Sequence, residues 1–139
     1  MKIELLTEEN DPQYRQLLNH SHERPDSLET ICSNPFRFCY LAIEDQQAVG
    51  YIDFSIMYEH AELNQIFVLD SYRKGKIATK LMNHMLNLCK EKQCENITLE
   101  VRIDNHSAIS LYEKFQFQKI ATRKNYYQTK DAWLMERKM

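Results

Sequence analysis

The sequence predicts a mixed α/β domain in which helices pack on a central sheet. Segments rich in branched and aromatic residues alternate along the chain with segments whose apolar residues recur at helical spacing. The chain has 139 residues, which is a common size for one compact domain and too few for two independent cores. We therefore expect residues 1–139 to form a single domain.

The overall composition excludes several classes of protein. The chain is 43% hydrophobic and 27% charged, which is the balance of a globular domain rather than of a disordered or fibrous one. Its net charge of -2 argues against a nucleic-acid partner held by a broad basic surface. Glu4 interrupts the apolar N-terminus, which therefore fits neither a signal peptide nor a membrane span. We expect a cytoplasmic protein with neither nucleic acid nor membrane as its partner.

The N-terminal part of the chain predicts one strand and two short helices. Ile3–Leu6 is typical of a short strand. Thr7, which two acidic residues follow, fits the N-cap of a helix that runs to Leu18. Ser27 can cap a second short helix, which Pro35 ends.

The middle of the chain predicts three consecutive strands and then a helix. Branched and aromatic residues at 38–43 and 49–57 flank a polar turn, as in a β-hairpin, and a third strand follows at 61–68. A basic loop at 70–76 comes next. A helix follows the loop, because four apolar residues repeat at helical spacing: Ile77, Leu81, Met85 and Leu88.

The C-terminal part predicts a strand, a helix and two closing strands. Every second residue from Ile97 to Val101 is apolar, so this strand has one apolar and one polar face. Asn105 fits the N-cap of the helix that follows. The closing strands are expected at 117–122 and 132–137.

The loop between Val68 and Ile77 has the composition of an anion-binding site. A strand, a glycine-containing turn and a helix start present free backbone N–H groups. Arg73, Lys74 and Lys76 add positive charge at the same place, which suits a pyrophosphate group. A solvated basic turn without a ligand explains the loop equally well when it is considered alone.

Neither a disulfide framework nor a metal site is expected. The four cysteines contain no Cys-x-x-Cys pair and are typical of reduced packing residues: Cys32, Cys39, Cys89 and Cys94. His20 and His22, together with Cys32, offer the His-x-His spacing of zinc ligands. No second ligand pair accompanies them, so solvated loop histidines are the better interpretation.

The basic loop resembles the coenzyme A pyrophosphate loop of the GNAT acetyltransferases. That loop reads Gln or Arg, two variable residues, Gly, one variable residue, and Gly or Ala. Arg73 and Ala78 match its ends, but Lys76 occupies the position of the central glycine, and Gly75 stands one place earlier. We expect Gly75 to take up the turn and to leave Lys76 in ordinary helical geometry.

A second segment resembles the RimI branch of the same family in order and spacing. The strong resemblance runs from about residue 61 to 135, whereas the N-terminal part agrees only in element order and in the loop Pro25-Asp26-Ser27. Asp26 stands where the family usually has an aromatic residue, and Gln116 stands where it has a glycine. The matching positions are Leu99, Glu100, Val101, Arg102, Asn105, Ala108, Leu111, Tyr112, Glu113, Phe117, Arg123, Tyr126, Tyr127, Asp131 and Ala132.

The resemblance implies a fold, a cosubstrate and residue roles. The GNAT fold is a central, mostly antiparallel sheet that is split near its middle and has helices on both faces, and acetyl-coenzyme A enters the split. Glu100 matches the proton acceptor and Tyr112 the proton donor, although a strand face and a packing tyrosine would also explain them. The resemblance implies no metal. The positions that match cofactor contacts are Ile66, Phe67, Val68, Arg73, Lys74, Gly75, Lys76, Ile77, Ala78, Thr79 and Asn105.

The resemblance also implies an acceptor groove beside Arg123, Tyr126 and Tyr127, between the two closing strands. Tyrosine pairs there also fit a purely structural role over a core. The best-known acceptor of the RimI branch is the N-terminal alanine of a small-subunit ribosomal protein. An α-amine, with a pKa of about 7.8 against about 10.4 for lysine, is more often neutral at pH 7. A small-molecule amine as acceptor, and a non-catalytic coenzyme A-binding or interaction module, are the alternatives.

Overall fold

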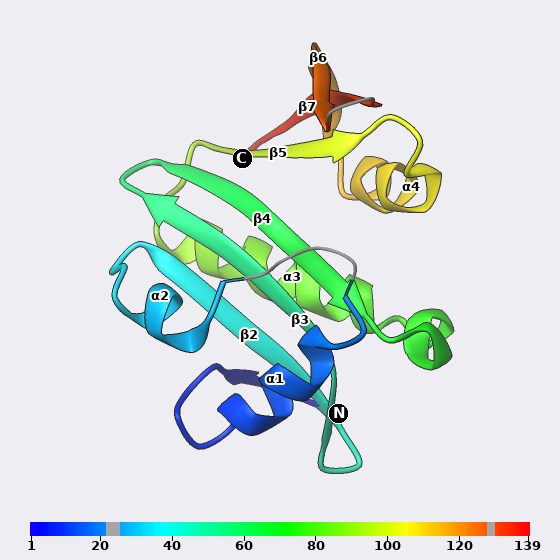
Figure 1. Cartoon of the computed structure of the whole chain (residues 1–139). Helices are drawn as coiled ribbons and strands as arrows, with labels where there is room; N and C mark the ends of the chain where they lie inside the picture. The colour runs from blue at the N-terminus through cyan, green and yellow to red at the C-terminus, as the bar shows by residue number, and fades with distance from the viewer. Residues whose placement is uncertain (22–25, 128–129) are drawn as a thin grey trace.

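The computed structural model describes residues 1–21, 26–127 and 130–139, and of residues 75 and 125–127 it describes the backbone alone. Within the described residues, seven strands form one mixed sheet in the order β1-β2-β3-β4-β5-β7-β6. Helices lie on both faces of this sheet (Figure 1). The expected α/β architecture is therefore confirmed.

The elements follow the expected order along the chain. The strands are β1 (Lys2–Leu5), β2 (Arg37–Glu44), β3 (Gln47–Met57), β4 (His60–Val68), β5 (Asn96–Arg102), β6 (Gln118–Tyr127) and β7 (Lys130–Lys138). The helices are α1 (Asp11–Leu18), α2 (Leu28–Cys32), the 3-10 helix η1 (Asp70–Gly75), α3 (Ile77–Glu91) and α4 (His106–Lys114). No helix in the described ranges is long and apolar enough to cross a membrane.

The sheet is split between β4 and β5. These strands pair in parallel, from His60 opposite Asn96 to Leu63 opposite Leu99, and all other neighbouring strands pair antiparallel. A β-bulge in β4 adds Asn64 between the pair Phe54 and Leu63 and the next pair along β3. A bulge bends a strand and increases its twist. Beyond Leu63 the two strands separate, which places the split where one half of the sheet meets the other.

Two apolar cores fill the spaces between the sheet and its helices. Figure 1 shows α1 and α2 in front of the first strands and α3 behind them. Alternate residues of β3 serve the two cores, because Tyr51 packs with α1 and α2 while Ile52 packs with α3. The α1/α2 core also contains Tyr14, Leu17, Ile31 and Leu41. The α3/α4 core contains Leu81, Met82, Met85, Leu99 and Ile109.

The predicted helix caps are confirmed at two positions and wrong at one. The Ser27 hydroxyl accepts from the Thr30 N–H at 3.3 Å, and the Asn105 Oδ1 accepts from the Ala108 N–H at 3.2 Å. Thr7 does not cap α1, which begins at Asp11. The Asn10 Oδ1 instead accepts from the Thr7 N–H at 2.8 Å, so Asn10 orders the turn that leads into the helix.

The last hairpin is longer than expected. β6 extends to Tyr127, which pairs with Lys130 across a short connection. Arg123, Tyr126 and Tyr127 therefore belong to a strand and not to a long loop between two strands. The antiparallel pairing with β7 is irregular between Arg123 and Tyr127, but it holds both ends of this segment, which a loop would leave to solvent.

The cysteines differ sharply in exposure. Cys39, Cys89 and Cys94 are buried, whereas Cys32 is exposed at the end of α2. Burial raises the pKa of Cys89 to about 12 and also raises the pKa of Cys39 and of Cys94. Because the thiolate is the reactive form, these three thiols combine poor access with poor ionisation.

Cys32 should therefore be the single thiol that reacts quickly in the folded protein. With an aromatic disulfide reagent at pH 8, we expect a fast phase of one thiol per chain, and the other three free cysteines should react only on unfolding. Cys32→Ser should remove the fast phase, and Cys94→Ser should leave it in place. A second fast thiol in the native protein would contradict the packing described for the sheet and α3.

Candidate functional site

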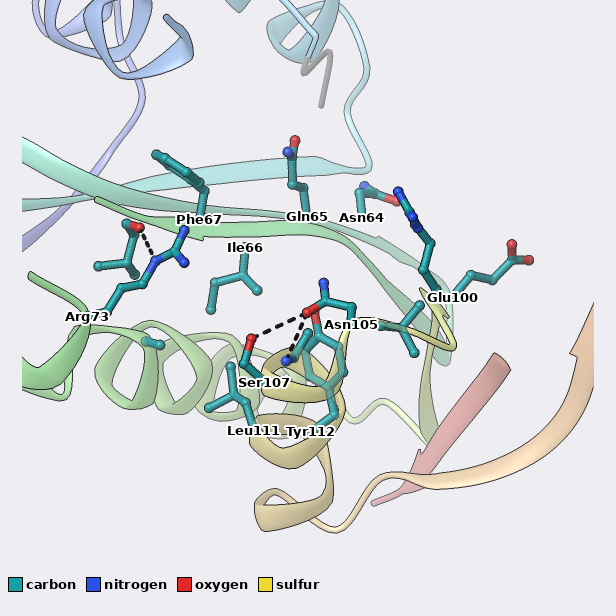
Figure 2. Close-up of a pocket in the computed structure, with 15 residues that line it drawn as sticks. Asn64, Gln65, Ile66, Phe67, Arg73, Glu100, Asn105, Ser107, Leu111 and Tyr112 are labelled. Atoms are coloured by element: carbon teal, nitrogen blue, oxygen red, sulfur yellow. Dashed lines mark hydrogen bonds between the residues drawn. The ribbon is translucent and has the colours of Figure 1, made fainter. Parts of the chain in front are cut away.

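A pocket of about 350 Å³ opens where β4 and β5 separate. β4 forms one wall, and β5 with the start of α4 forms the other, as Figure 2 shows. The pocket reaches from polar residues of β4 to the basic loop before α3. Its lining residues are Asn64, Gln65, Ile66, Phe67, Val68, Arg73, Ala78, Glu100, Val101, Arg102, Asn105, Ser107, Ala108, Leu111 and Tyr112.

The β4 wall offers a strand edge. Ile66, Phe67 and Val68 line the pocket, and they lie beyond the last residue pair that β4 makes with β5. Among the described strands, none pairs with this edge. An extended ligand with amide groups can add to such an edge as a further strand. This placement agrees with the cofactor-contact role predicted for the three residues, which stays a prediction.

Arg73 carries positive charge into the pocket. Its Nε donates to the Val68 carbonyl at 2.9 Å, and its Nη1 lies 3.1 Å from Asp70 Oδ1. Its guanidinium carbon also lies 6.0 Å from the centre of the Phe67 ring. Arg73 is thus fastened along the wall at the end of β4. Ala78 also lines the pocket, whereas the other predicted loop contacts do not: Lys74, Gly75, Lys76, Ile77 and Thr79.

The backbone of the basic loop corrects one prediction. Lys76 has φ 64° and ψ 18°, which is the left-handed conformation, and Gly75 is the last residue of η1. The expectation that Gly75 takes up the turn and leaves Lys76 helical is therefore wrong. Lys76 ends η1 and begins α3, so the change of direction between the two helices falls on it. Gln116, the second residue at a usual glycine position, is also left-handed with φ 67°.

Glu100 faces the α1/α2 side of the sheet, because its neighbours Leu99 and Val101 point into the core on the other side. The Glu100 carboxylate forms an ion pair with the Arg123 guanidinium of β6 through Oε1. Its Oε2 is buried and has no hydrogen-bond partner within the described residues. Arg123 itself does not line the pocket, and the side chains of Tyr126 and Tyr127 lie outside the described residues.

Tyr112 reaches the pocket from α4, on the face of the sheet opposite to the one that Glu100 faces. It is 8% exposed and packs at a ring-centre distance of 6.0 Å from Phe117. Tyr112 is therefore both a core residue and a lining residue, so the packing role and the predicted proton-donor role are compatible. Asn105 lies beside it in Figure 2 and uses its Oδ1 to cap α4. Its Nδ2 is directed away from α4 in Figure 2, so this N–H donor belongs to the pocket lining.

Two lining residues were missed by the sequence reasoning although the sequence carries a signal for them. In β4, apolar and polar residues alternate through Leu63, and then Asn64 and Gln65 place two polar residues together. Such a break in a period-two pattern indicates a β-bulge. The structure has its bulge at this point. Ser107, a third missed residue, lies in the first turn of α4 and carries no comparable signal.

The histidine and cysteine cluster considered as a zinc site is only partly described. His22 lies outside the described residues, while His20 and Cys32 are exposed. Within the part of the chain that the structure describes, no group of three or more His, Cys, Asp or Glu side chains is arranged to hold a metal ion.

Residues 3–117 match the model of the acetyltransferase (GNAT) family. A ribosomal protein bS18-alanine N-acetyltransferase of Haemophilus influenzae is 34% identical over 114 residues, which is 81% of this chain and 77% of the relative. An N-alpha-acetyltransferase of Saccharolobus solfataricus is 38% identical over 112 residues, which is 70% of this chain and 67% of the relative. Relatives in Bacillus subtilis and Danio rerio match over 64% and 36% of their own length, so the chain spans less than two thirds of those proteins.

Solved structures show the same fold. The ribosomal-protein-S18-alanine N-acetyltransferase of Escherichia coli superposes with a TM-score of 0.85 at 23% identity, over 97% of this chain and 91% of that one. A GNAT family acetyltransferase of Elizabethkingia anophelis with acetyl-CoA bound gives a TM-score of 0.83 at 17% identity, over 99% and 97%. At these identities the likeness establishes the split-sheet fold alone.

The left-handed Lys76 generates a stability prediction. We expect Lys76→Gly to raise the free energy of unfolding by up to about 1 kcal/mol, because the left-handed conformation costs an L-residue about 1–2 kcal/mol and the freedom of glycine in the unfolded chain costs about 0.5–1 kcal/mol. Lys80→Gly, at an exposed position inside α3, should instead lower it by about 1 kcal/mol. Urea unfolding measures both. Equal destabilisation by the two variants would indicate a helical backbone at Lys76 and would contradict its left-handed conformation.

Proposed function

Because this chain belongs to the acetyltransferase (GNAT) family, we propose that it transfers the acetyl group of acetyl-coenzyme A to an amine. The observation that carries this proposal is the pocket in the sheet split, which is lined by Glu100 from β5 and by Tyr112 from α4. Acyl transfer from a thioester needs a proton acceptor for the amine and a proton donor for the leaving thiolate. The two residues supply one of each.

The residues of the pocket fit acetyl-coenzyme A as the donor. The free edge of β4 at 66–68 suits the amide groups of its pantetheine arm, and the hydrogen-bonding groups of that edge lie in the pocket wall. Arg73, with Lys74 and Lys76 exposed nearby, suits the pyrophosphate at the start of α3. The acetyl thioester would then lie in the split, between β4 and β5.

In the proposed reaction, the amine nitrogen attacks the thioester carbonyl carbon, so a C–N bond forms and the C–S bond breaks. Glu100 accepts a proton from the amine, and Tyr112 donates one to the coenzyme A sulfur. The ion pair with Arg123 bears on the first step, because the guanidinium competes with a cationic acceptor for the same carboxylate. Arrival of an ammonium group would loosen this pair.

We propose the N-terminal α-amine of a protein as the acceptor. The names of the relatives support it, since they describe an alanine N-acetyltransferase and an N-alpha-acetyltransferase. The lower pKa of an α-amine compared with lysine supports it chemically. Asp26 favours a small-molecule amine as the second candidate, because its carboxylate is held by Arg37 at 2.8 Å where the family usually presents an aromatic ring to the acceptor.

Tyr112→Phe tests the proton donor. The ring keeps its place in the core while the hydroxyl is lost, so we expect kcat to fall on the order of 100-fold with little change in acetyl-CoA affinity. Release of free coenzyme A measures the rate, and calorimetry measures the affinity. Tyr72→Phe, which removes a hydroxyl from a residue that does not line the pocket, is the matched control. Unchanged turnover in Tyr112→Phe would remove this residue from the mechanism.

Glu100→Gln tests the proposed proton acceptor in the same way. Its loss of kcat/KM should be greatest at low pH, where few amines are already neutral and a base matters most. A loss that grows as the pH rises would contradict the base role.

A panel of amines tests the acceptor. At pH 7 we expect peptides with a free, small N-terminal residue to be acetylated faster than N-terminally blocked peptides that contain lysine, because the α-amine is more often neutral. Diamines form the third arm. If diamines outrun every peptide, the small-molecule acceptor is correct. Absence of acetyl-CoA binding at millimolar concentration would instead identify a non-catalytic module.

A further inference from the structure

Two neighbouring residues of β4, Asn64 and Gln65, border the pocket on the side of α1 and α2 (Figure 2). Successive residues of a regular strand point to opposite faces, but the bulge in β4 lets both side chains reach the same side. Each ends in an amide, which has two N–H donors at one end and an oxygen acceptor at the other. Which end faces the pocket decides what the pocket can bind.

The orientation of the Asn64 amide is set by its partners. Asn64 Nδ2 lies 3.0 Å from Ser55 Oγ and 3.5 Å from Asp53 Oδ1. An ionised carboxylate only accepts hydrogen bonds, so the NH₂ end of Asn64 faces Asp53. The Asn64 oxygen is therefore directed away from Asp53. Within the described residues no donor is bonded to that oxygen.

Arg37 favours the charged form of the Asp53 carboxyl. Asp53 is only 3% exposed, and its desolvation raises the pKa of the carboxyl. The Arg37 guanidinium opposes this shift by binding both carboxylate oxygens, with Nε 3.1 Å from Oδ1 and Nη2 on Oδ2. A two-point contact of this kind fixes the plane of the carboxylate as well as its charge. Arg37 thus holds the acceptor that orients Asn64.

The same arginine reaches the segment between α1 and α2. Arg37 Nη1 lies 2.8 Å from Asp26 Oδ2, and the Tyr14 hydroxyl donates to the Asp26 carbonyl at 2.7 Å. Gln65 has an anchor in this segment as well, because its Nε2 donates to Ser21 Oγ at 3.2 Å. The amide NH₂ groups of both pocket residues are therefore engaged with the protein, and their oxygens remain for a ligand.

We propose that the amide oxygens of Asn64 and Gln65 receive the N–H groups of the acceptor amine, and that Arg37 is a positioning residue that fixes the Asn64 amide for this task. The inference rests on the proposed acetyl transfer and specifies how its acceptor is held. Neutral carbonyl oxygens bind an amine in either protonation state. They can hold the nitrogen while a separate group, Glu100, takes its proton, and they direct its N–H groups away from the thioester carbon.

Gln65 allows a test of the oxygen itself. Gln65→Leu removes the amide at nearly constant volume, so the acceptor KM should rise about tenfold, the cost of about 1.4 kcal/mol for a lost hydrogen bond to an amine. Gln65→Glu should restore most of this loss, because a carboxylate accepts from the amine and the Ser21 hydroxyl can donate to it. The acetyl-CoA KM should stay within about twofold in both. Equal rises in acceptor KM for Leu and Glu would overturn the oxygen role.

A second variant tests whether Arg37, through Asp53, orients the Asn64 amide. Arg37→Met combined with Asp53→Asn removes both charges together, so no buried charge is left alone. Asn at position 53 can present either end of its amide, so Asn64 loses its fixed orientation, and the acceptor KM should rise by about threefold to tenfold. Arg15→Met is the matched control, since it also takes an arginine away from a buried carboxylate, that of Asp11 in α1, which lies 2.8 Å from the Arg15 Nε and outside the pocket lining.

Thermal melting and the acetyl-CoA KM report whether the double variant is folded. A folded double variant with an unchanged acceptor KM would overturn the positioning role of Arg37. Wild-type protein that acetylates diamines but no peptide contradicts the proposed protein acceptor only, and the Gln65 test is then read with the diamine. If the wild-type protein turns over no amine, both proposals are overturned. If the wild-type protein is active and Gln65→Leu leaves the acceptor KM unchanged, only the proposal about the amide oxygens is overturned.

Discussion

The molecule depends on one interruption in its sheet. β4 and β5 pair for four residues and then part, at the position where β4 is bulged at Asn64. Pairing along the whole length would join the two walls and leave no pocket. The interruption exposes a strand edge to a ligand, leaves Glu100 and Tyr112 to line one opening, and turns two amides toward the side of α1 and α2. Each functional element of the site is a consequence of it.

Local chemistry in the sequence accounts for much of the fold. Strands and helices follow the apolar periodicity, and Ser27 and Asn105 cap the helices that their positions suggest. Thr7 shows where such reasoning fails, because Asn10 offers a competing side chain and binds the turn in both directions, accepting from Thr7 and donating to Leu5 at 3.0 Å. The longer β6 was missed because residues 123–127 carry no strand pattern, although β7 pairs with Arg123 and Tyr127 at the two ends of that segment. Tertiary partners decide both cases.

The site itself was less accessible to sequence reasoning than the fold. Arg73, Glu100, Asn105 and Tyr112 were placed by resemblance, and the structure gathers them around one pocket. The pairing of Glu100 with Arg123 joins residues 23 positions apart on two strands that are not neighbours in the sheet, so no periodicity indicates it. The prediction for Lys76 was wrong for a different reason. Glycine adopts a left-handed conformation more easily than lysine, so the turn was expected at Gly75, but η1 and α3 meet one residue later, at Lys76.

The short β4–β5 pairing also leaves few hydrogen bonds between two parts of the sheet. One unit is the meander β1 to β4 with α1 to α3, and the other is β5, β7 and β6 with α4. Within the described part of the sheet only residues 60–63 and 96–99 pair across the two units, while the α3/α4 core contains residues of both. Regions joined by few hydrogen bonds can open without global unfolding, and such openings are seen in amide hydrogen exchange. The amides along this seam should therefore exchange sooner than those within the β2–β3 hairpin. A ligand lying across the split would bind both units at once and would add to the coupling that their shared core provides.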